Sequence, residues 1–521
     1  MVARRSFIRG LSALGIGAAA APVLAADSHQ AMEPATASTS FEPDIEFELV
    51  AKVAESELLD GFQTRIWCYT GEVLAGPQSA LSYLDGSGHI PVIRVRMGQK
   101  VRVHFRNQLP EPSIVHWHGL NIPQRMDGHP MYAIDPGQTY VYEFTVMNRA
   151  GTYWFHPHPH ERTAYQVYQG LAGLLIINDD EEETIGLPDG DLDLALLIQD
   201  RTFDLQAQLQ HLSPMRHNWM MGFSGQQVLV NGKSAYFKQL DRTAYRLRLF
   251  NGSNSTLYRL SWSDSRPFTI IGTDGGLIDR ARDQRYISIG VGERVDVWLS
   301  VAESSPEDLL HLMAESYNPR LENITAAQEG GVMLGDARAI ASFAMSEATP
   351  VRSEKPSSLS QLPELLAEEA VNAAAPKQIR LSMMRGQAML NGRVFGQMSE
   401  VASEDISKLG TSEIWEFRND TSMGMGGMGA MMQMAHPMHV HNVQFKILNR
   451  DLGAGQRSPV AMALQEGFTD FGLKDVVLVR PGERVQVLMR FENFAGIYLY
   501  HCHILEHEDL GMMQNYLIEP V

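Results

Sequence analysis

The stretch Gly496-Ile497-Tyr498-Leu499-Tyr500-His501-Cys502-His503, near the C-terminal end of the chain, decides the fold. Its aromatic and aliphatic residues predict a β-strand that leads into the last three positions. Successive side chains of a strand point to opposite faces, so His501 and His503 would share one face and Cys502 would point to the other. Two imidazoles on one face and a thiol on the other predict two sites joined by a few backbone atoms.

A closely similar stretch occurs earlier, as Gly151-Thr152-Tyr153-Trp154-Phe155-His156-Pro157-His158. Two shorter phrases recur three times, always in the same order, and such repeats indicate three homologous domains. Short strands between Gly, Pro and Asp turns are typical of all-β sandwiches. The first phrase, an alternating strand ending in Asn, covers residues 101–107, 245–251 and 414–419, and the second, a Gly-containing turn, covers residues 136–141, 291–296 and 481–486.

The length of 521 residues also favours several domains, because one hydrophobic core rarely serves more than ~300 residues. The sequence predicts an all-β protein with domains at residues 44–180, 190–348 and 377–521. Residues 27–43, rich in Ala, Ser, Thr and Pro, are predicted to form a mobile linker, and residues 349–376 to join the second and third domains. The histidine pairs lie only in the first and third copies, so the second domain is predicted to be a structural spacer.

The first 26 residues are typical of a twin-arginine export signal. Arg4-Arg5 precedes a short apolar stretch that contains Pro22 and ends in small residues suited to cleavage. A membrane anchor is the alternative, but this stretch is too short, and no later stretch has the length of a membrane span. We therefore expect a periplasmic, monomeric protein, exported by the twin-arginine machinery and without a membrane anchor in its mature form.

The net charge of −18 disfavours nucleic acid as a partner and favours cations. A solvated acidic surface is the alternative explanation of the same number. The charge therefore supports a cationic substrate without identifying one.

Cys68 and Cys502 are the only two cysteines. In an oxidising compartment two cysteines could pair, but a metal ligand at Cys502 would leave Cys68 free. Ile66-Trp67-Cys68-Tyr69 is typical of a buried strand, where cysteine behaves as a small hydrophobe. Cys68 is therefore predicted to be structural.

Four His-x-His pairs occur in the chain, two in each of the outer domains. Each pair would present two imidazoles on one face of a strand, and imidazole suits copper well. One pair alone is weak evidence, because two surface or core histidines produce the same pattern, but four pairs at matching positions are far stronger. The pairs are His116/His118, His156/His158, His439/His441 and His501/His503.

A second set of ligands surrounds Cys502. His436 lies just before the third histidine pair, and His507 and Met512 follow the thiol closely. Two imidazoles, a thiolate and a weak axial thioether are the ligands of an electron-transfer copper. Because Cys502 lies between two histidines of the other set, the sequence predicts a short backbone route for electrons.

These motifs resemble those of the multicopper oxidase family, and most closely the bacterial periplasmic cuprous oxidases and laccase-like three-domain enzymes. The resemblance covers almost the whole chain after the signal. It implies three cupredoxin-like Greek-key β-sandwich domains and four copper ions as cofactors. It implies a type 1 copper at His436, Cys502, His507 and Met512, a type 2 copper at His116 and His439, and a binuclear type 3 pair at His118, His156, His158, His441, His501 and His503.

The resemblance also implies catalytic acids, since the reduction of oxygen to water consumes protons. Glu508 matches a family proton donor, and Asp127, in Arg125-Met126-Asp127-Gly128, matches an acid near the type 2 copper. The alternative for each is an ordinary hydrogen-bonded carboxylate. His129 and His160 match no motif, and we interpret them as local structure.

Methionines around His436, from Met423 to Met438, bear on the substrate. Soft thioethers prefer Cu(I) to hard cations, and Met434 matches a substrate-copper position in bacterial cuprous oxidases. The alternative is a flexible Met/Gly insertion over an apolar entrance; typical cuprous oxidases also carry acidic residues here, whereas this stretch has only Asp420. The methionines of the stretch are Met423, Met425, Met428, Met431, Met432, Met434 and Met438.

The sequence therefore predicts an oxidase that couples oxidation of the cuprous ion to reduction of molecular oxygen, acting in copper tolerance. A laccase-like oxidase of phenolic reductants is the first alternative. A non-catalytic copper-binding or structural cupredoxin protein is the second, and the complete ligand set disfavours it. A copper nitrite reductase would not need four histidine pairs.

Overall fold

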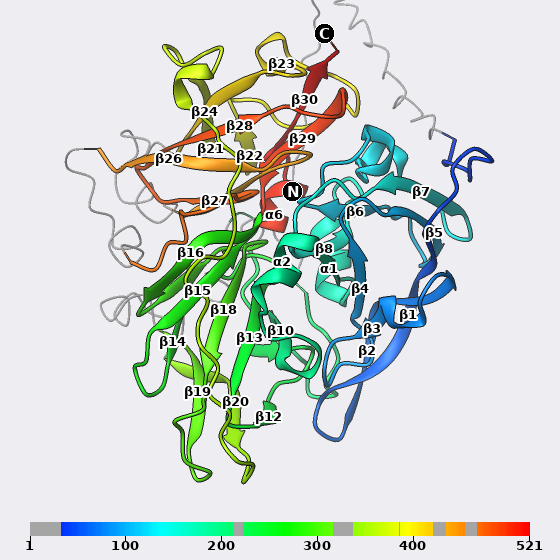
Figure 1. Cartoon of the computed structure of the whole chain (residues 1–521). Coiled ribbons are helices and arrows are strands. Elements are labelled where there is room, and N and C mark those ends of the chain that lie inside the picture. The colour runs from blue at the N-terminus through cyan, green and yellow to red at the C-terminus, as the bar shows by residue number, and fades with distance from the viewer. Residues whose placement is uncertain are drawn as a thin grey trace, which may run out of the picture.

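The computed structural model describes residues 33–211, 220, 222–315, 337–384, 386–419, 434–453 and 466–520. The predicted signal and the methionines from Met423 to Met432 lie outside these residues. The described strands form six sheets, which group in chain order into three pairs (Figure 1). The predicted all-β fold is confirmed. None of the described helices is long and apolar enough to cross a membrane.

Domain one contains sheets of order β2-β1-β5-β7 and β3-β4-β9-β8-β6. Apolar residues of both sheets, among them Phe47 and Leu175, form one core. Its helices are α1 (Thr163–Gln169), α2 (Asp180–Ile185) and the 3₁₀ helices η1 (Gln78–Ala80), η2 (Gln124–Met126), η3 (Pro130–Tyr132) and η4 (Gly190–Leu192). Its strands are β1 (Ile45–Leu59), β2 (Phe62–Ala75), β3 (Leu81–Tyr83), β4 (Pro91–Arg96), β5 (Lys100–Gln108), β6 (Val115–His118), β7 (Thr139–Thr145), β8 (Gly151–Pro157) and β9 (Gly173–Asn178).

Domain two contains sheets of order β11-β10-β13-β18-β15-β16 and β12-β20-β19-β14-β17. Leu247 and Leu312 lie in the core between them. Its strands are β10 (Asp193–Arg201), β11 (Gln227–Val230), β12 (Tyr236–Leu240), β13 (Ala244–Asn251), β14 (Tyr258–Trp262), β15 (Phe268–Thr273), β16 (Gly276–Gln284), β17 (Ile287–Ile289), β18 (Arg294–Ser300), β19 (Leu309–Ala314) and β20 (Arg338–Met345).

Domain three contains sheets of order β22-β21-β24-β28-β26 and β23-β30-β29-β25-β27. Val487 and Tyr500 lie in its core. Its helices are α6 (Leu505–Asp509) and the 3₁₀ helices η6 (Ala367–Glu369) and η7 (Ser403–Asp405). Its strands are β21 (Lys377–Met384), β22 (Gln387–Leu390), β23 (Ile406–Lys408), β24 (Ser412–Arg418), β25 (His436–Val440), β26 (Phe445–Asp451), β27 (Val476–Val479), β28 (Arg484–Arg490), β29 (Gly496–Cys502) and β30 (Met513–Glu519).

The recurring phrases form the same link in every domain. The Asn that ends the first phrase exchanges two backbone hydrogen bonds with the turn of the second phrase. The Gly of that turn has a φ between 77° and 86°, a left-handed conformation that glycine adopts without steric cost. The link holds the first phrase's strand beside the antiparallel strand that follows the turn. The linked positions are Asn107 with Gly137, Asn251 with Gly292, and Asn419 with Gly482.

Domains one and three meet at the centre of the molecule, where α1, α6 and β8 lie close together (Figure 1). Ala164 and Val167 of α1 pack against Leu505 of α6. The backbone N–H groups of Thr163 and Ala164 each donate to the Asp509 carboxylate, at 3.0 Å. These contacts bring the ends of β8 and β29, which carry histidine pairs, to the same place.

Residues 33–44 lie along domain one. Ala35 is buried, and its carbonyl accepts a hydrogen bond of 2.9 Å from the Val141 N–H. Arg102 donates to the carbonyls of Ser38 and Phe41. This part of the predicted linker is therefore fixed to the sandwich, and the domain boundaries expected from the sequence stay predictions.

Candidate metal centres

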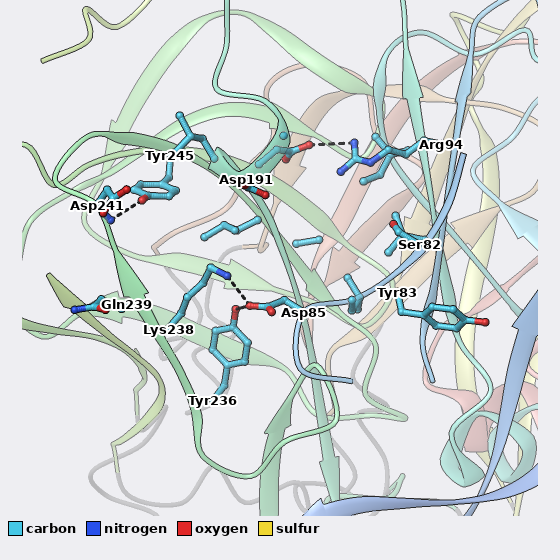
Figure 2. A pocket seen from close by; sticks show the side chains of 18 residues that line it. Ser82, Tyr83, Asp85, Arg94, Asp191, Tyr236, Lys238, Gln239, Asp241 and Tyr245 are labelled. Carbon is cyan, nitrogen blue, oxygen red and sulfur yellow. Dashed lines mark hydrogen bonds and ion pairs between the residues drawn. The ribbon is translucent and has the colours of Figure 1, made fainter. Parts of the chain in front are cut away.

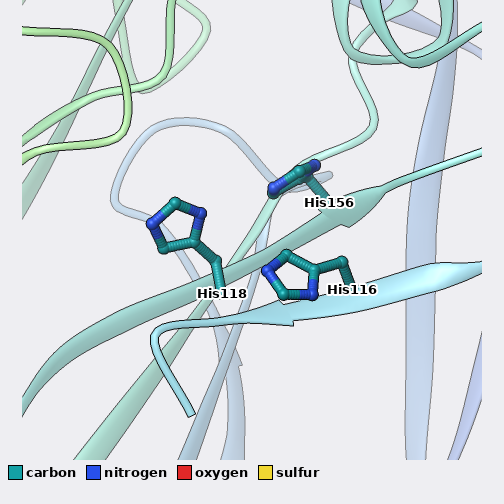
Figure 3. A group of neighbouring side chains, drawn as sticks. All are labelled: His116, His118 and His156. Carbon is teal, nitrogen blue, oxygen red and sulfur yellow. The ribbon is translucent and has the colours of Figure 1, made fainter. Parts of the chain in front are cut away.

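Two histidine pairs from each outer domain meet between those domains. In domain one, β6 pairs antiparallel with β8, and this register places His116 opposite His156. In domain three, β25 pairs antiparallel with β29 and places His439 opposite His501. The second histidine of each pair lies two residues further on and so shares the face of the first. Figure 3 shows His116, His118 and His156 turned toward a common space.

The eight rings form one fully buried group, here called the histidine cluster, which crosses the boundary between domains one and three. Rings from different domains approach through their ring nitrogens. The approaches are His116 Nε2 to His439 Nε2 at 3.4 Å, His118 Nδ1 to His503 Nε2 at 3.3 Å, His158 Nε2 to His501 Nε2 at 3.5 Å, and, within domain three, His441 Nε2 to His501 Nε2 at 3.1 Å.

Hydrogen bonds at the outer nitrogens determine which nitrogen of a ring faces the cluster. Nδ1 of His116 donates to the Asp127 carbonyl at 2.6 Å, and Nδ1 of His439 donates to the Asp475 carbonyl at 2.7 Å. A carbonyl only accepts, so each Nδ1 carries the proton and each Nε2 presents a lone pair. These two lone pairs face each other with no proton between them. A bound cation would stabilise this arrangement, and the outer carbonyls are typical partners of metal-binding histidines.

Burial keeps the imidazoles neutral. Desolvation lowers the pKa of His156 to about 3 and those of His501 and His507 to about 4. It lowers the pKa of the other rings well below the ordinary value. Neutral imidazole is the form that binds a metal. His156 Nε2, which faces His116 and His118, has no hydrogen-bond partner among the described residues, so the donor set fits copper ions.

A second group, here called the thiol site, surrounds Cys502 at the end of β29. Its Sγ lies 3.4 Å from His436 Nδ1 and 3.7 Å from His507 Nδ1, and the two nitrogens lie 3.3 Å apart. Met512 is buried in the same apolar core, and its backbone is hydrogen-bonded to those of Cys502 and His507. Burial raises the pKa of the thiol, whereas a bound soft cation favours the thiolate. The thiol site therefore also fits a copper ion.

Cys502 connects the two groups. Its side chain lies with His436 and His507, while its chain neighbours His501 and His503 belong to the histidine cluster. This opposite orientation follows from the alternation of side chains along β29. Two short backbone paths therefore lead from the sulfur to the cluster.

Three buried carboxyl groups contact the cluster, those of Asp127, Glu508 and Asp475. Asp127 Oδ2 accepts from His441 Nδ1 at 2.8 Å. Glu508 of α6 lies 3.6 Å from His158 Nδ1 and 3.5 Å from His501 Nδ1. Burial raises the pKa of Asp127 well above the ordinary value and that of Glu508 to about 8. Both acids singled out in the sequence thus lie against the histidines.

His129 and His160 lie outside both groups. His129 Nδ1 accepts from the Met131 N–H at the start of η3, and its Nε2 lies 2.8 Å from Asn515 Oδ1. The ring of His160 packs near that of Phe395, with 5.4 Å between the ring centres. Their interpretation as local structure agrees with these contacts.

Domain two, predicted to be a structural spacer, packs against both groups. A Cβ on Gly292, whose φ is +84°, would lie 3.2 Å from His503 Nε2 and 3.3 Å from His118 Cε1. The carbonyl of Met220 accepts from His507 Nε2 at 3.1 Å. These residues form walls of the cluster and of the thiol site. Met220 lies in no sequence motif, and the recurring phrase that contains Gly292 predicts a turn but not this contact, because the contacts depend on packing between domains.

Two methionines of the predicted metal-binding stretch are described. Met434 is 9% exposed and lies in the same core cluster as Cys502. Its carbonyl accepts from Asn419 Nδ2 at 2.7 Å. Met438 is fully buried on β25 and belongs to the domain core, so it is not part of an accessible methionine surface.

A separate cavity of about 540 Å³ lies between domains one and two (Figure 2). Asp85 accepts from Lys238 Nζ at 2.7 Å and from the Tyr236 hydroxyl at 3.0 Å, and Arg94 donates to Asp193 at 3.2 Å. None of the candidate metal-binding or catalytic residues lines the cavity. We interpret it as part of the domain boundary.

The comparisons with known proteins agree with this geometry. Multicopper oxidase family models match residues 69–182 and 370–521, which lie in the two histidine-bearing domains. The multicopper oxidase mco of Staphylococcus haemolyticus is 31% identical over 81% of this chain and 80% of its own length. The laccase of Bacillus subtilis is 29% identical over 87% of this chain and 90% of its own.

A solved structure of a multicopper oxidase from Campylobacter jejuni, described as a metallo-oxidase, has a TM-score of 0.70 to this structure. It is 25% identical, and the match covers 94% of this chain and 94% of that one. The chain belongs to the multicopper oxidase family. It is thus an oxidoreductase that uses molecular oxygen and a reducing substrate.

Proposed function

We propose that the protein oxidises Cu(I) to Cu(II) and passes the electrons to molecular oxygen. One oxygen molecule, four cuprous ions and four protons give two water molecules and four cupric ions. The observation that carries the oxidase chemistry is the position of Cys502. Its sulfur lies between His436 and His507, and its neighbours in the sequence, His501 and His503, belong to the histidine cluster. This arrangement supports an entry point for single electrons next to a buried site for several metal ions.

In this proposal the thiol site, with Met512 as the weak fourth ligand, holds a type 1 copper. The histidine cluster holds a type 2 copper at His116 and His439 and a type 3 pair at its other six rings. When bound, these ions take electrons one at a time and supply them to oxygen. The neutral rings, with the Nε2 lone pairs of His116 and His439 directed inward, support this assignment.

The chain's own residues prepare the site and supply protons. The fully buried rings exclude bulk water, which strengthens electrostatic interactions within the cluster. The Glu508 carboxyl group lies 3.6 Å from His158 Nδ1 and 3.5 Å from His501 Nδ1. A carboxyl group there can hand a proton to reduced oxygen and be reprotonated through neighbouring polar groups. Asp127 holds His441 in place and is the second candidate acid.

Cu(I) as the substrate is supported by the soft thioether of Met434, two residues before His436 and buried in the same core cluster as Cys502. The net charge of −18 favours cations, and the Campylobacter jejuni relative is a metallo-oxidase. Oxidation of Cu(I) would serve copper tolerance in the periplasm. The twin-arginine pattern at Arg4-Arg5 supports export to that compartment.

Oxidation of phenols is the second candidate function, and the laccase of Bacillus subtilis among the relatives favours it. Oxygen consumption by the copper-loaded protein separates the two, with a cuprous complex or a simple phenol as the only reductant and no free copper. We expect fast uptake with Cu(I) and little with phenol. The reverse result would establish a laccase.

Replacing Met434 by leucine should raise the KM for Cu(I) about tenfold, equivalent to ~1.4 kcal/mol of binding, because leucine keeps the volume but lacks the sulfur. The kcat and the KM for any phenol oxidised should not change. Steady-state oxygen uptake measures both constants. Met389→Leu, at a similarly buried methionine of domain three, is the matched control. An equal effect on phenol oxidation would contradict a role in Cu(I) binding.

A further inference from the structure

An arginine of domain two reaches the histidine cluster through a carboxylate of domain three. Arg294, the first residue of β18, is fully buried. Its Nη1 and Nη2 atoms each lie 2.6 Å from one carboxylate oxygen of Asp475. Oδ1 of the same carboxylate lies 3.0 Å from His118 Nε2 in domain one. The contacts Arg294–Asp475–His118 therefore join all three domains beside the cluster.

The carboxylate orients His118 differently from the other rings. Because His118 Nε2 faces Asp475, its Nδ1 faces the cluster, 3.3 Å from His503 Nε2. His116 and His439 face the cluster with Nε2 instead, since their Nδ1 atoms donate to carbonyls. The position of Asp475 thus decides which nitrogen of His118 is available to a metal.

Hydrogen bonds to backbone carbonyls fix the Arg294 side chain in position. Its Nε donates to the Thr152 carbonyl at 2.9 Å, Nη1 to the Gly292 carbonyl at 2.9 Å, and Nη2 to the Asp274 carbonyl at 3.0 Å. With the two bonds to Asp475, all five N–H groups of the guanidinium have an acceptor. A guanidinium held by these hydrogen bonds is fixed in position, so the Asp475 carboxylate to which it donates is also fixed.

The chain around Asp475 is shaped for this close approach. Gly119, directly after His118, has a φ of +86°, and a Cβ there would lie 2.4 Å from Asp475 Oδ2. Lys474 pairs with Asp274 at 3.1 Å and with Glu293 at 3.0 Å, both in domain two. Buried charges of opposite sign are therefore paired across the boundary between domains two and three.

We propose that Arg294 is a positioning residue of the copper cluster. It holds Asp475 so that His118 presents Nδ1 to the metal, and domain two thereby sets the geometry of a site to which it gives no ligand. This inference rests on the copper-binding role proposed above for the histidine cluster. Partners of this kind typically change metal affinity 10–100-fold when they are removed.

A second buried arginine of domain two provides a matched control. Arg246 donates to Asp296 from Nε at 3.1 Å and from Nη2 at 2.6 Å, and it also pairs with Glu182 of domain one. It is as buried as Arg294 and likewise joins two domains, but its partners Asp296 and Glu182, unlike Asp475, form no ion pair with a cluster ring. A purely structural role would make the two arginines equivalent.

The test compares Arg294→Gln and Arg246→Gln with the wild-type protein. Copper is removed from each full-length protein, and its rebinding is measured by competition with a chelator. We expect Arg294→Gln to lower the affinity of the weakest cluster copper about 10–100-fold. Arg246→Gln should leave copper affinity unchanged, although both variants lose thermal stability. The visible absorption of thiolate-bound copper at Cys502 should persist in both.

Arg294→Lys keeps the charge that compensates Asp475 but cannot donate two parallel hydrogen bonds to its carboxylate. It should therefore fold but bind copper more weakly than the wild-type protein. Wild-type affinity in Arg294→Lys, or equal losses in the two glutamine variants, would overturn the inference. If Arg294→Gln does not fold, the lysine variant alone decides the matter. A wild-type protein that binds no copper would instead refute the proposed function itself.

Discussion

Replacing Cys502 by serine will abolish oxidase activity while the histidine cluster still binds copper. The hydroxyl of serine keeps the position between His436 and His507 but is a hard, weak ligand for copper, and the electron route through the sulfur is lost. We expect oxygen uptake to fall more than about a thousandfold, equivalent to at least ~4 kcal/mol of barrier. The visible absorption of the thiolate-bound copper should vanish, while copper analysis still finds metal in the cluster.

Cys68→Ser is the control for this substitution. Cys68 is buried among Leu58, Ile66 and Leu229, far in sequence from any residue of the two sites. A hydroxyl there should lower the melting temperature but leave oxygen uptake and the visible spectrum unchanged. Substantial uptake by Cys502→Ser would show that electrons enter the cluster by another route.

Replacing Glu508 by glutamine will lower kcat about a hundredfold, the effect typical of a lost general acid. Glutamine keeps the size and the contacts with His158 and His501 but cannot donate a carboxyl proton. Because protons are consumed after electrons have entered, the loss should be the same with Cu(I) and with phenol as reductant. Steady-state oxygen uptake with both reductants, at matched copper content, measures it.

Glu506→Gln is the matched control, at a neighbouring buried acid of α6. Glu506 Oε1 accepts from Asn254 Nδ2 at 2.8 Å, and its ion pair is with His211 rather than with a cluster ring. We expect this variant to keep most of its kcat. Equal losses in the two variants, or a loss seen with only one reductant, would contradict a proton-donor role for Glu508.

Local periodicity made much of this protein predictable. The recurring Asn and Gly phrases could be aligned in the sequence because each forms the same pair of backbone hydrogen bonds in its domain, as at Asn107 and Gly137. The period of two along a strand placed the histidines of each pair on one face. It also placed Cys502 on the opposite face from His501. These features depend on residues a few positions apart, and sequence patterns report such features well.

The support around the cluster could not be predicted in this way. Arg294 and Arg484 occupy the same position of the same Gly-Glu-Arg-Val phrase, yet Arg294 is fully buried and Arg484 is exposed. The difference arises because domain two packs against Asp475 and Thr152, which belong to the other domains. Met220 and Gly292 reach the two sites through packing between domains as well. Contacts of this kind depend on how domains dock, and no local pattern encodes that.

The position of the histidine cluster also determines when the protein can become functional. His116 and His439 lie 323 positions apart in the chain yet face each other at 3.4 Å. Half of the histidine cluster is therefore synthesised early. The cluster stays incomplete until β29, almost the last strand, folds onto domain one. In the proposed function, a metal ion held by both His116 and His439 would bind only after domain three is made, and it would close a loop of more than 300 residues. In the proposed function, copper binding would therefore depend on correct docking, since a truncated or misdocked chain lacks the complete histidine cluster.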